Sequence, residues 1–175
     1  MRKFNVTGIC VPNMHYMVDI SEKIEKIFAL VEDSNYFTFN RGRQYGKTTT
    51  LGRLKKRIAE ESDYICVSIS FQYSTEKIIS DEEGFCQWLL RKIHRALLLE
   101  HKEEAKLWLE ESITDFEKLD HFITERCKNK KIVLIVDDSD RVINNYLFVR
   151  LLDVLKSKYL KKSALKYYTF QSVIF

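Results

Sequence analysis

The chain has 175 residues, of which 45% are hydrophobic and 31% are charged, with one proline and five glycines. This composition is typical of a soluble globular protein that is long enough for one domain with its own core. No apolar run approaches membrane-spanning length, and no signal-peptide core follows the first residues, so we expect a cytoplasmic protein with no membrane partner.

The net charge of +4 is modest, because acidic and basic residues are interleaved along the chain. Most lysine clusters lie near the ends of predicted helices, where cations suit the helix dipole, so we expect solvated helix faces and no dedicated nucleic-acid surface. The cysteines form no C-x-x-C pair, which argues against a disulfide framework, and with the histidines they show no convincing metal-ligand spacing. They are Cys10, Cys66, Cys86 and Cys127.

The first half of the chain predicts an irregular start, a helix, a strand and a second helix. Apolar residues at helical spacing follow Ser21, which is a suitable N-cap. An alternating aromatic run predicts a strand over 36–40. A polar turn with two glycines comes next, and Gly46-Lys47-Thr48 then opens a helix that extends to about Glu61.

Strand, glycine turn, Lys-Thr and helix form the order that a phosphate-binding loop requires. Glycines let backbone N–H groups approach phosphate oxygens, and the helix adds the positive end of its dipole. Lys47 can reach the β- and γ-phosphates, and the Thr48 hydroxyl can bind Mg²⁺. The strict motif has glycine at position 41, where this chain has Arg41, with Gly42 one place later. An ordinary strand–turn–helix connection is the alternative.

The second half of the chain predicts further strands alternating with helices. A β-rich strand spans 64–71, and capping boxes at 80–83 and 114–117 each begin a helix. The amphipathic segment past Glu100, through Trp108, has an uncertain boundary, and its aromatic residues are expected in the core. A last strand is expected over 167–175. The alternation predicts a parallel α/β sheet.

Ile132-Val133-Leu134-Ile135-Val136 is a continuous aliphatic run, which is the pattern of a central parallel strand covered by helices on both faces. It ends in two carboxylates about 90 residues after the glycine loop, as in a Walker B motif. Asp137 would hold Mg²⁺, directly or through water, and Asp138 would polarise the attacking water as a general base. A strand-ending turn rich in Asp and Ser is the alternative interpretation.

With both motifs placed, the chain resembles a family of prokaryotic AAA-like P-loop ATPases related to the STAND and archaeal-type ATPases. Residues 4–19 are similar to its N-terminal segment, in which a Gly, a Pro and a His-Tyr pair precede the first helix. Residues 41–48 are similar to its loop, which commonly carries Arg-Gln before Gly-Lys-Thr. Residues 137–140 are similar to its Walker B region.

The resemblance implies a three-layer αβα P-loop NTPase fold with a mostly parallel sheet, and it implies ATP and Mg²⁺ as cofactors. Preference for ATP over GTP rests on the resemblance alone. The metal ligands would be Thr48 and Asp137, and the catalytic residues Lys47 and Asp138. The implied nucleotide-binding residues are His15, Tyr16, Gly42, Arg43, Gln44, Tyr45, Gly46, Lys47, Thr48 and Thr49.

Two departures from the family pattern affect the expected activity. The family usually has Asp-Glu where this chain has Asp137-Asp138, and the shorter base is consistent with weaker hydrolysis and retained binding. The strand at 167–175 should lie between the loop strand and the Walker B strand, and the chain then stops. We therefore expect no fifth strand, lid or arginine finger.

We interpret residues 1–175 as a single, C-terminally incomplete AAA-like domain, with an N-terminal segment over 1–20 and a nucleotide-binding core over 21–175. The expected function is that of a slow ATPase or nucleotide-dependent switch. The alternatives are a truncated remnant or assembly subunit with little turnover, and a P-loop small-molecule kinase. An open edge on the strand at 36–40 predicts self-association or a protein partner there.

Overall fold

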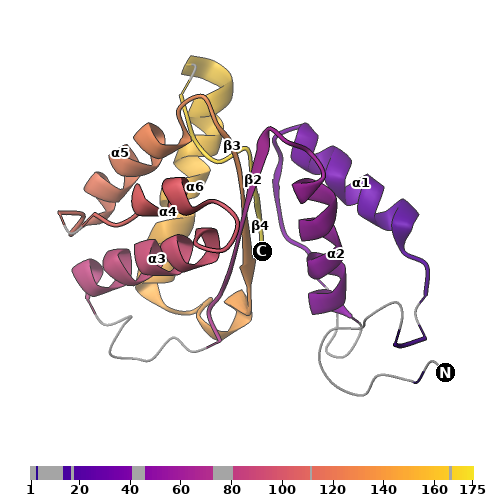
Figure 1. Ribbon diagram of the computed structural model, residues 1–175. Helices are drawn as coiled ribbons and strands as arrows, with labels where there is room; N and C mark the ends of the chain where they lie inside the picture. Colours follow the sequence, from indigo (N-terminus) through magenta and orange to yellow (C-terminus); the bar gives the residue numbers. More distant parts are fainter. Residues whose placement is uncertain are drawn as a thin grey trace.

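The computed structural model describes residues 3, 14–16, 18–40, 46–72, 81–110, 112–165 and 167–175. Helices and strands alternate along most of this part of the chain, as expected (Figure 1). The elements are α1 (Ser21–Glu32), β1 (Tyr36–Phe37), α2 (Lys47–Ala59), β2 (Tyr64–Ser70), α3 (Glu82–Leu97), α4 (Lys102–Lys106), α5 (Phe116–Cys127), β3 (Lys131–Asp137), a 3-10 turn η1 (Ser139–Arg141), α6 (Tyr146–Leu165) and β4 (Ser172–Ile174).

The four described strands form one parallel sheet in the order β1-β4-β3-β2. The predicted α/β class is confirmed, and so is the placement of the last strand between the loop strand and the strand that ends in Asp137. The longest pairing joins β2 to β3, from Tyr64 opposite Lys131 to Ser70 opposite Asp137. This register brings the carboxyl-terminal ends of β2 and β3 together at the carboxyl edge of the sheet.

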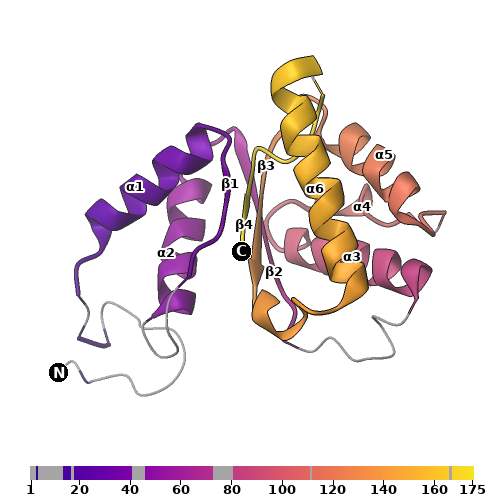
Figure 2. The same ribbon diagram turned by 180° about the vertical axis from the view of Figure 1, so that it is seen from behind.

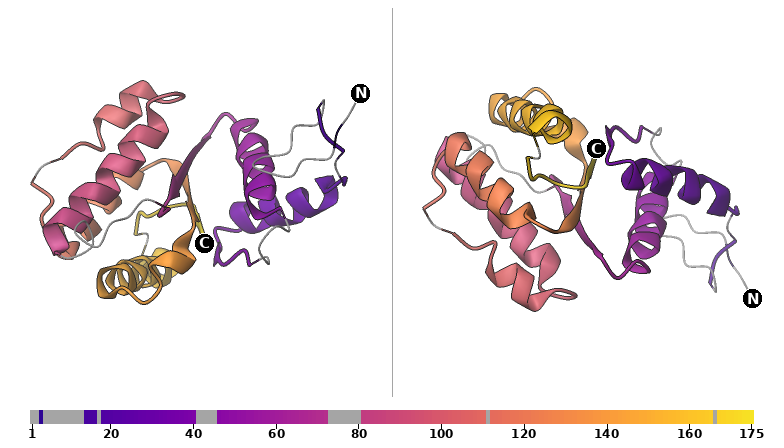
Figure 3. Two further views of the ribbon diagram at one scale, coloured as in Figure 1. Left: turned by 90° about the horizontal axis from the view of Figure 1, so that it is seen from below. Right: turned by 90° about the horizontal axis from the view of Figure 1, so that it is seen from above.

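Helices cover both faces of the sheet and make three layers, with α1 and α2 on one face and α3 to α6 on the other (Figures 1 and 3). Side chains of β3 alternate between the two apolar clusters. Val133 and Ile135 pack with α1 and α2, whereas Ile132, Leu134 and Val136 pack with the other helices. The continuous aliphatic run is thus buried on both faces, as predicted for a central parallel strand.

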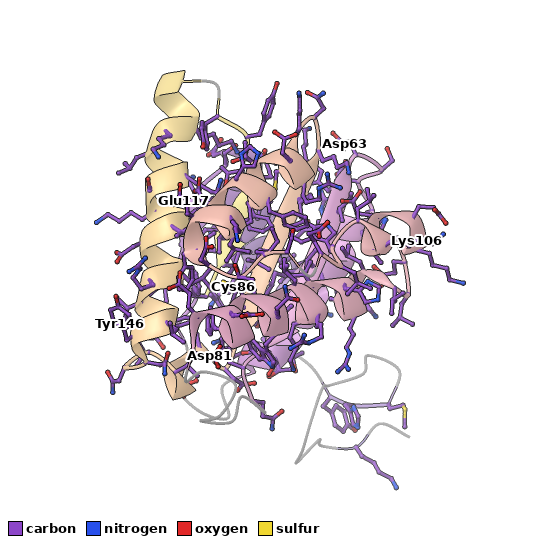
Figure 4. The ribbon with its side chains drawn as sticks, turned by 90° about the vertical axis from the view of Figure 1, so that its left-hand side faces the viewer. Asp63, Asp81, Cys86, Lys106, Glu117 and Tyr146 are labelled. Carbon is purple, nitrogen blue, oxygen red and sulfur yellow. The ribbon has the colours of Figure 1, made fainter. Side chains whose placement is uncertain are left out.

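The N-caps of three helices each lie one residue away from the predicted position. Asp81, labelled in Figure 4, accepts a hydrogen bond of 2.7 Å from the Gly84 N–H at the start of α3. Asp115 accepts one of 2.8 Å from the Lys118 N–H at the start of α5. The predicted caps at Ser80 and Thr114 were therefore wrong, because a carboxylate cap also interacts favourably with the helix dipole. Ser80 itself lies outside the described residues.

Ser21 is likewise the first residue of α1 and not its N-cap. Its backbone N–H and its hydroxyl both donate to Asp19 Oδ1, at 2.9 and 2.7 Å. The chain therefore enters α1 through an aspartate turn two residues upstream.

Several elements are shorter than the sequence predicted. β1 covers only the first two residues of 36–40, and β4 covers only 172–174 of 167–175. The Phe39 N–H still donates to the Phe175 carbonyl at 2.6 Å. α2 ends at Ala59, and the segment after Glu100 forms the short helix α4. Trp108 is fully buried and stacks on Phe170 with ring centroids 6.1 Å apart, so the aromatic residue of this segment does belong to the core.

Lys158 is a fully buried cation that ties α6 to α5. Its ammonium donates to Thr124 Oγ1 at 2.6 Å and pairs with Asp120 Oδ1 at 3.2 Å. Burial lowers the pKa of Lys158, whereas Asp120 works to raise it. The pair satisfies a charge that would otherwise be costly inside the protein.

The three described cysteines should make the fold sensitive to alkali. Cys66, Cys86 and Cys127 are buried and free, and burial raises the pKa of each thiol from 9.0 to about 12. In the unfolded chain the thiols would lose their protons from about pH 9, whereas in the folded protein they keep them up to about pH 12. The stability of the fold should therefore decrease as the pH rises from 9 to 12. Each thiol adds a slope of up to about 1.4 kcal/mol per pH unit.

Urea unfolding from pH 8 to pH 11 measures this slope. Cys66→Ala should show a shallower alkaline decline than the wild type, whatever its stability at pH 8, because one of the titrating thiols is gone. The lowered pKa of Lys158 makes stability rise with pH, which is opposite to the effect of the thiols. This contribution is the same in both proteins, so it does not affect the comparison. Identical slopes for the two proteins would contradict the prediction.

Candidate functional site at the carboxyl edge of the sheet

The carboxyl ends of β2 and β3 lie at the same end of the molecule as the start of α2 (Figures 1 and 2). β3 ends at Asp137, β2 ends at Ser70, and α2 begins at Lys47. The backbone pairing continues one step further, because the Phe71 N–H donates to the Asp137 carbonyl at 3.1 Å. This edge is where ligands bind in open parallel α/β sheets.

Gly46 is the N-cap of α2 and has a left-handed backbone, with φ 76° and ψ 30°. Glycine adopts this conformation without the steric cost that a Cβ would add. Gly46 has no side chain that could cap the helix, and the first turn of α2 carries the positive end of the helix dipole. Such a helix start is suited to an anion.

Lys47 and Asp137 form an ion pair across the two predicted motifs. Lys47 Nζ lies 3.3 Å from Asp137 Oδ1, and the two side chains are 26% and 20% exposed. The same oxygen accepts a hydrogen bond of 2.9 Å from the backbone N–H of Asp138. Residues 90 positions apart in the sequence are therefore in direct contact, because α2 begins beside the end of β3.

Asp138 has a left-handed backbone and a different partner. Its φ and ψ angles are 57° and 27°, a conformation that few residues other than glycine, asparagine and aspartate adopt. Its Oδ2 accepts a hydrogen bond of 2.8 Å from the Ser70 hydroxyl, whose oxygen accepts one of 3.0 Å from the Gln72 N–H. A strained residue held by its neighbours is often part of a functional site.

Ser70 is the residue of this site that the sequence analysis missed. It lies at the end of β2, directly opposite Asp137 in the sheet register. A polar residue closing a β-rich run was the available signal. Its significance depends on β2 and β3 being neighbours, which the sequence did not establish.

The other predicted site residues are placed as follows. Thr48 is exposed and Thr49 half-buried in the first turn of α2. His15 is half-buried in an isolated parallel bridge with Lys3, and Tyr16 is exposed. Gly42, Arg43, Gln44 and Tyr45 lie outside the described residues.

The oxygen-rich donor set at this edge fits Mg²⁺. A threonine hydroxyl and aspartate carboxylates are hard ligands of the kind that Mg²⁺ prefers, usually with waters and phosphate oxygens completing the shell. Among the described residues, no group of three or more His, Cys, Asp or Glu side chains is placed to hold a metal. A metal at this edge would thus rely on hydroxyl, water or phosphate oxygens as well.

A groove of about 660 Å³ lies elsewhere, along α5 and the segment before it. Both acidic and basic side chains line this groove, and it contains no residue of either motif. We therefore place the candidate site at the sheet edge and not in this groove.

A three-layer αβα domain with a parallel sheet, a Gly-Lys-Thr helix start and two aspartates after a central strand is consistent with a P-loop NTPase-like fold. The sequence model described as an AAA-like domain matches residues 19–172, and the chain belongs to this AAA-like family. Membership suggests a nucleotide-binding function of the ATPase type.

Neither a search of curated proteins nor a search of solved structures gives a match to this chain. In the part of the chain that the structure describes, no helix is both long and apolar enough to cross a membrane.

The backbone of Asp138 generates a prediction about stability. Asp138→Asn should stay within about 0.5 kcal/mol of the wild type, because asparagine tolerates the left-handed conformation and can still accept from Ser70. Asp138→Val should cost about 1–2 kcal/mol or more, because a β-branched residue is an outlier at positive φ. Chemical unfolding of the two variants measures this difference.

Ser70→Ala serves as the control, because it removes the hydrogen bond and leaves the Asp138 backbone unchanged. If Ser70→Ala destabilises the protein as much as Asp138→Val, the hydrogen bond and not the backbone accounts for the cost. Equal stability of Asp138→Asn and Asp138→Val would contradict the prediction.

Proposed function

We propose that this chain binds ATP with Mg²⁺ at the carboxyl edge of the sheet and acts as a slow ATPase or nucleotide-dependent switch. The observation that carries the proposal is the 3.3 Å contact between Lys47 and Asp137. A phosphate-binding cation and a metal-binding carboxylate need to be close together, since both act on the same phosphate groups. An ordinary strand–turn–helix connection would not require this meeting of two distant motifs.

In this proposal, Lys47 and the N–H groups at the start of α2 bind phosphate oxygens. Loop residues 42–45 with Gly46 and Thr49 complete the phosphate site, and His15 and Tyr16 contact the nucleotide. Thr48 and Asp137 hold Mg²⁺, which when bound would neutralise phosphate charge. Asp138 orients or deprotonates the attacking water.

Of the two proposed functions, slow ATPase and nucleotide-dependent switch, the hydrogen bond of 2.8 Å from Ser70 to Asp138 supports the switch. The Ser70 hydroxyl occupies one acceptor position of the Asp138 carboxylate, so fewer positions are left at which this carboxylate can accept a proton from water. Its side chain is also one methylene shorter than the glutamate usual in the resembled family. Nucleotide binding with little turnover is the outcome that both features favour. A small-molecule kinase remains less well supported, because a kinase would not need the two carboxylates after β3.

Lys47→Ala should abolish nucleotide binding and leave the fold intact, because it removes the cation that is proposed to bind phosphate at the start of α2. Calorimetric titration with ATP·Mg²⁺ measures the affinity, and circular dichroism checks the fold. Lys55→Ala is the matched control: Lys55 lies on the same helix but pairs with Glu100 at 3.1 Å. Lys55→Ala should bind as the wild type does. Unchanged affinity in a folded Lys47→Ala variant would overturn the phosphate-site assignment.

We further propose that the chain self-associates through the outer edge of β1, which lies at one end of the described strand order. The Phe37 carbonyl accepts a hydrogen bond from the Phe175 N–H, and the Phe39 N–H donates one to the Phe175 carbonyl. The backbone groups of Phe37 and Phe39 therefore face β4. Since backbone groups alternate sides along a strand, the N–H and C=O of the exposed Thr38 point away from β4. An outward donor and acceptor of this kind can pair with another chain.

Light scattering at increasing protein concentration should show association in the wild type and in Thr38→Ala, which keeps the backbone donor. Thr38→Pro should reduce it, because proline has no N–H to donate. A wild-type protein that stays monomeric at all concentrations, or equal association of both variants, would argue against the β1 edge.

A further inference from the structure

The Lys47–Asp137 ion pair joins two groups that the proposed function assigns to different ligands. Lys47 is assigned to phosphate and Asp137 to Mg²⁺, yet here each is the other's partner at 3.3 Å. Both side chains are less than one-third exposed, so water screens their attraction less than it would for a fully exposed pair. Any ligand that engages either group has to act against this contact.

We propose that Lys47 and Mg²⁺ compete for the Asp137 carboxylate, so that Asp137 holds Lys47 away from phosphate until a divalent cation takes its place. The inference rests on the proposed function and adds a coupling to it. Metal binding at Asp137 frees the lysine for phosphate, and phosphate binding to the lysine frees the carboxylate for metal. By linkage, each ligand then raises the affinity of the other.

The geometry around Asp137 supports competition at one oxygen atom. Oδ1 faces the Lys47 ammonium and also accepts the Asp138 N–H at 2.9 Å. A divalent cation bound to this carboxylate would lie close to the ammonium, and two like charges a few ångströms apart repel strongly in a partly buried site. The ammonium and the metal therefore exclude each other there.

The second carboxylate at this edge provides an internal comparison. Asp138 lies next in the chain, but its Oδ2 accepts from the Ser70 hydroxyl, and its backbone N–H is bonded to Asp137. Neutralising Asp138 removes the same unit of charge from the same edge without removing the partner of Lys47. A purely long-range electrostatic effect on nucleotide affinity would therefore be similar for the two aspartates.

The experiment titrates the wild type, Asp137→Asn and Asp138→Asn with a fluorescent ATP analogue, once in EDTA and once in excess Mg²⁺. In EDTA, Asp137→Asn should bind the analogue roughly two- to five-fold more tightly than the wild type, the range expected for releasing a partly exposed ion pair. Asp138→Asn should show a smaller increase in affinity for the analogue in EDTA. In Mg²⁺ the order should reverse, with Asp137→Asn binding more weakly than the wild type because it has lost a metal ligand.

A second measurement tests the pair without nucleotide. A double-mutant cycle of urea unfolding with Lys47→Met and Asp137→Asn should give a coupling between the two sites, whereas a cycle of Lys47→Met with Asp138→Asn should give less. Equal gains for both aspartate variants in EDTA, or no gain for Asp137→Asn, would overturn this inference while leaving nucleotide binding in place. A wild type that binds the analogue in neither buffer would overturn the proposed function itself, and this inference with it.

Discussion

The burial of β3 on both faces is the constraint on which the rest of the structure depends. Five consecutive aliphatic residues lie between two helical layers, and a slip of one residue would exchange the side chains that face each layer. The register is therefore fixed, and it sets Asp137 opposite Ser70 at the edge of the sheet. The first polar residues after this run can only emerge at that edge, beside the start of α2.

Two adjacent aspartates at this edge have different environments because the backbone turns between them. Asp137 still belongs to the extended strand and meets a cation, Lys47. Asp138 has a left-handed backbone and meets a neutral hydroxyl, that of Ser70. Separate partners are consistent with the separate roles that we propose for the two carboxylates. The difference in partners follows from one change of backbone conformation.

The helices behind the sheet are held by polar contacts between elements as well as by the apolar core. Glu82, in the first turn of α3, accepts a hydrogen bond of 2.7 Å from the Phe116 N–H at the start of α5. Lys158 joins α6 to α5 through Thr124 and Asp120. Asn145 accepts from the N–H groups of Leu147 and Phe148 at the start of α6. These contacts position the layer against which β3 and the end of β2 are packed.

The sequence by itself determined the class of fold, the central place of 132–136 and the two motifs, because burial on both faces and helical spacing leave local patterns in the chain. It did not determine the caps at Asp81 and Asp115, where neighbouring polar residues were equally suitable by pattern. Only the tertiary structure decided that Lys47 contacts Asp137 and that Ser70 contacts Asp138. Such contacts depend on which strands are neighbours and in what register, and these are set by packing between residues far apart in the chain.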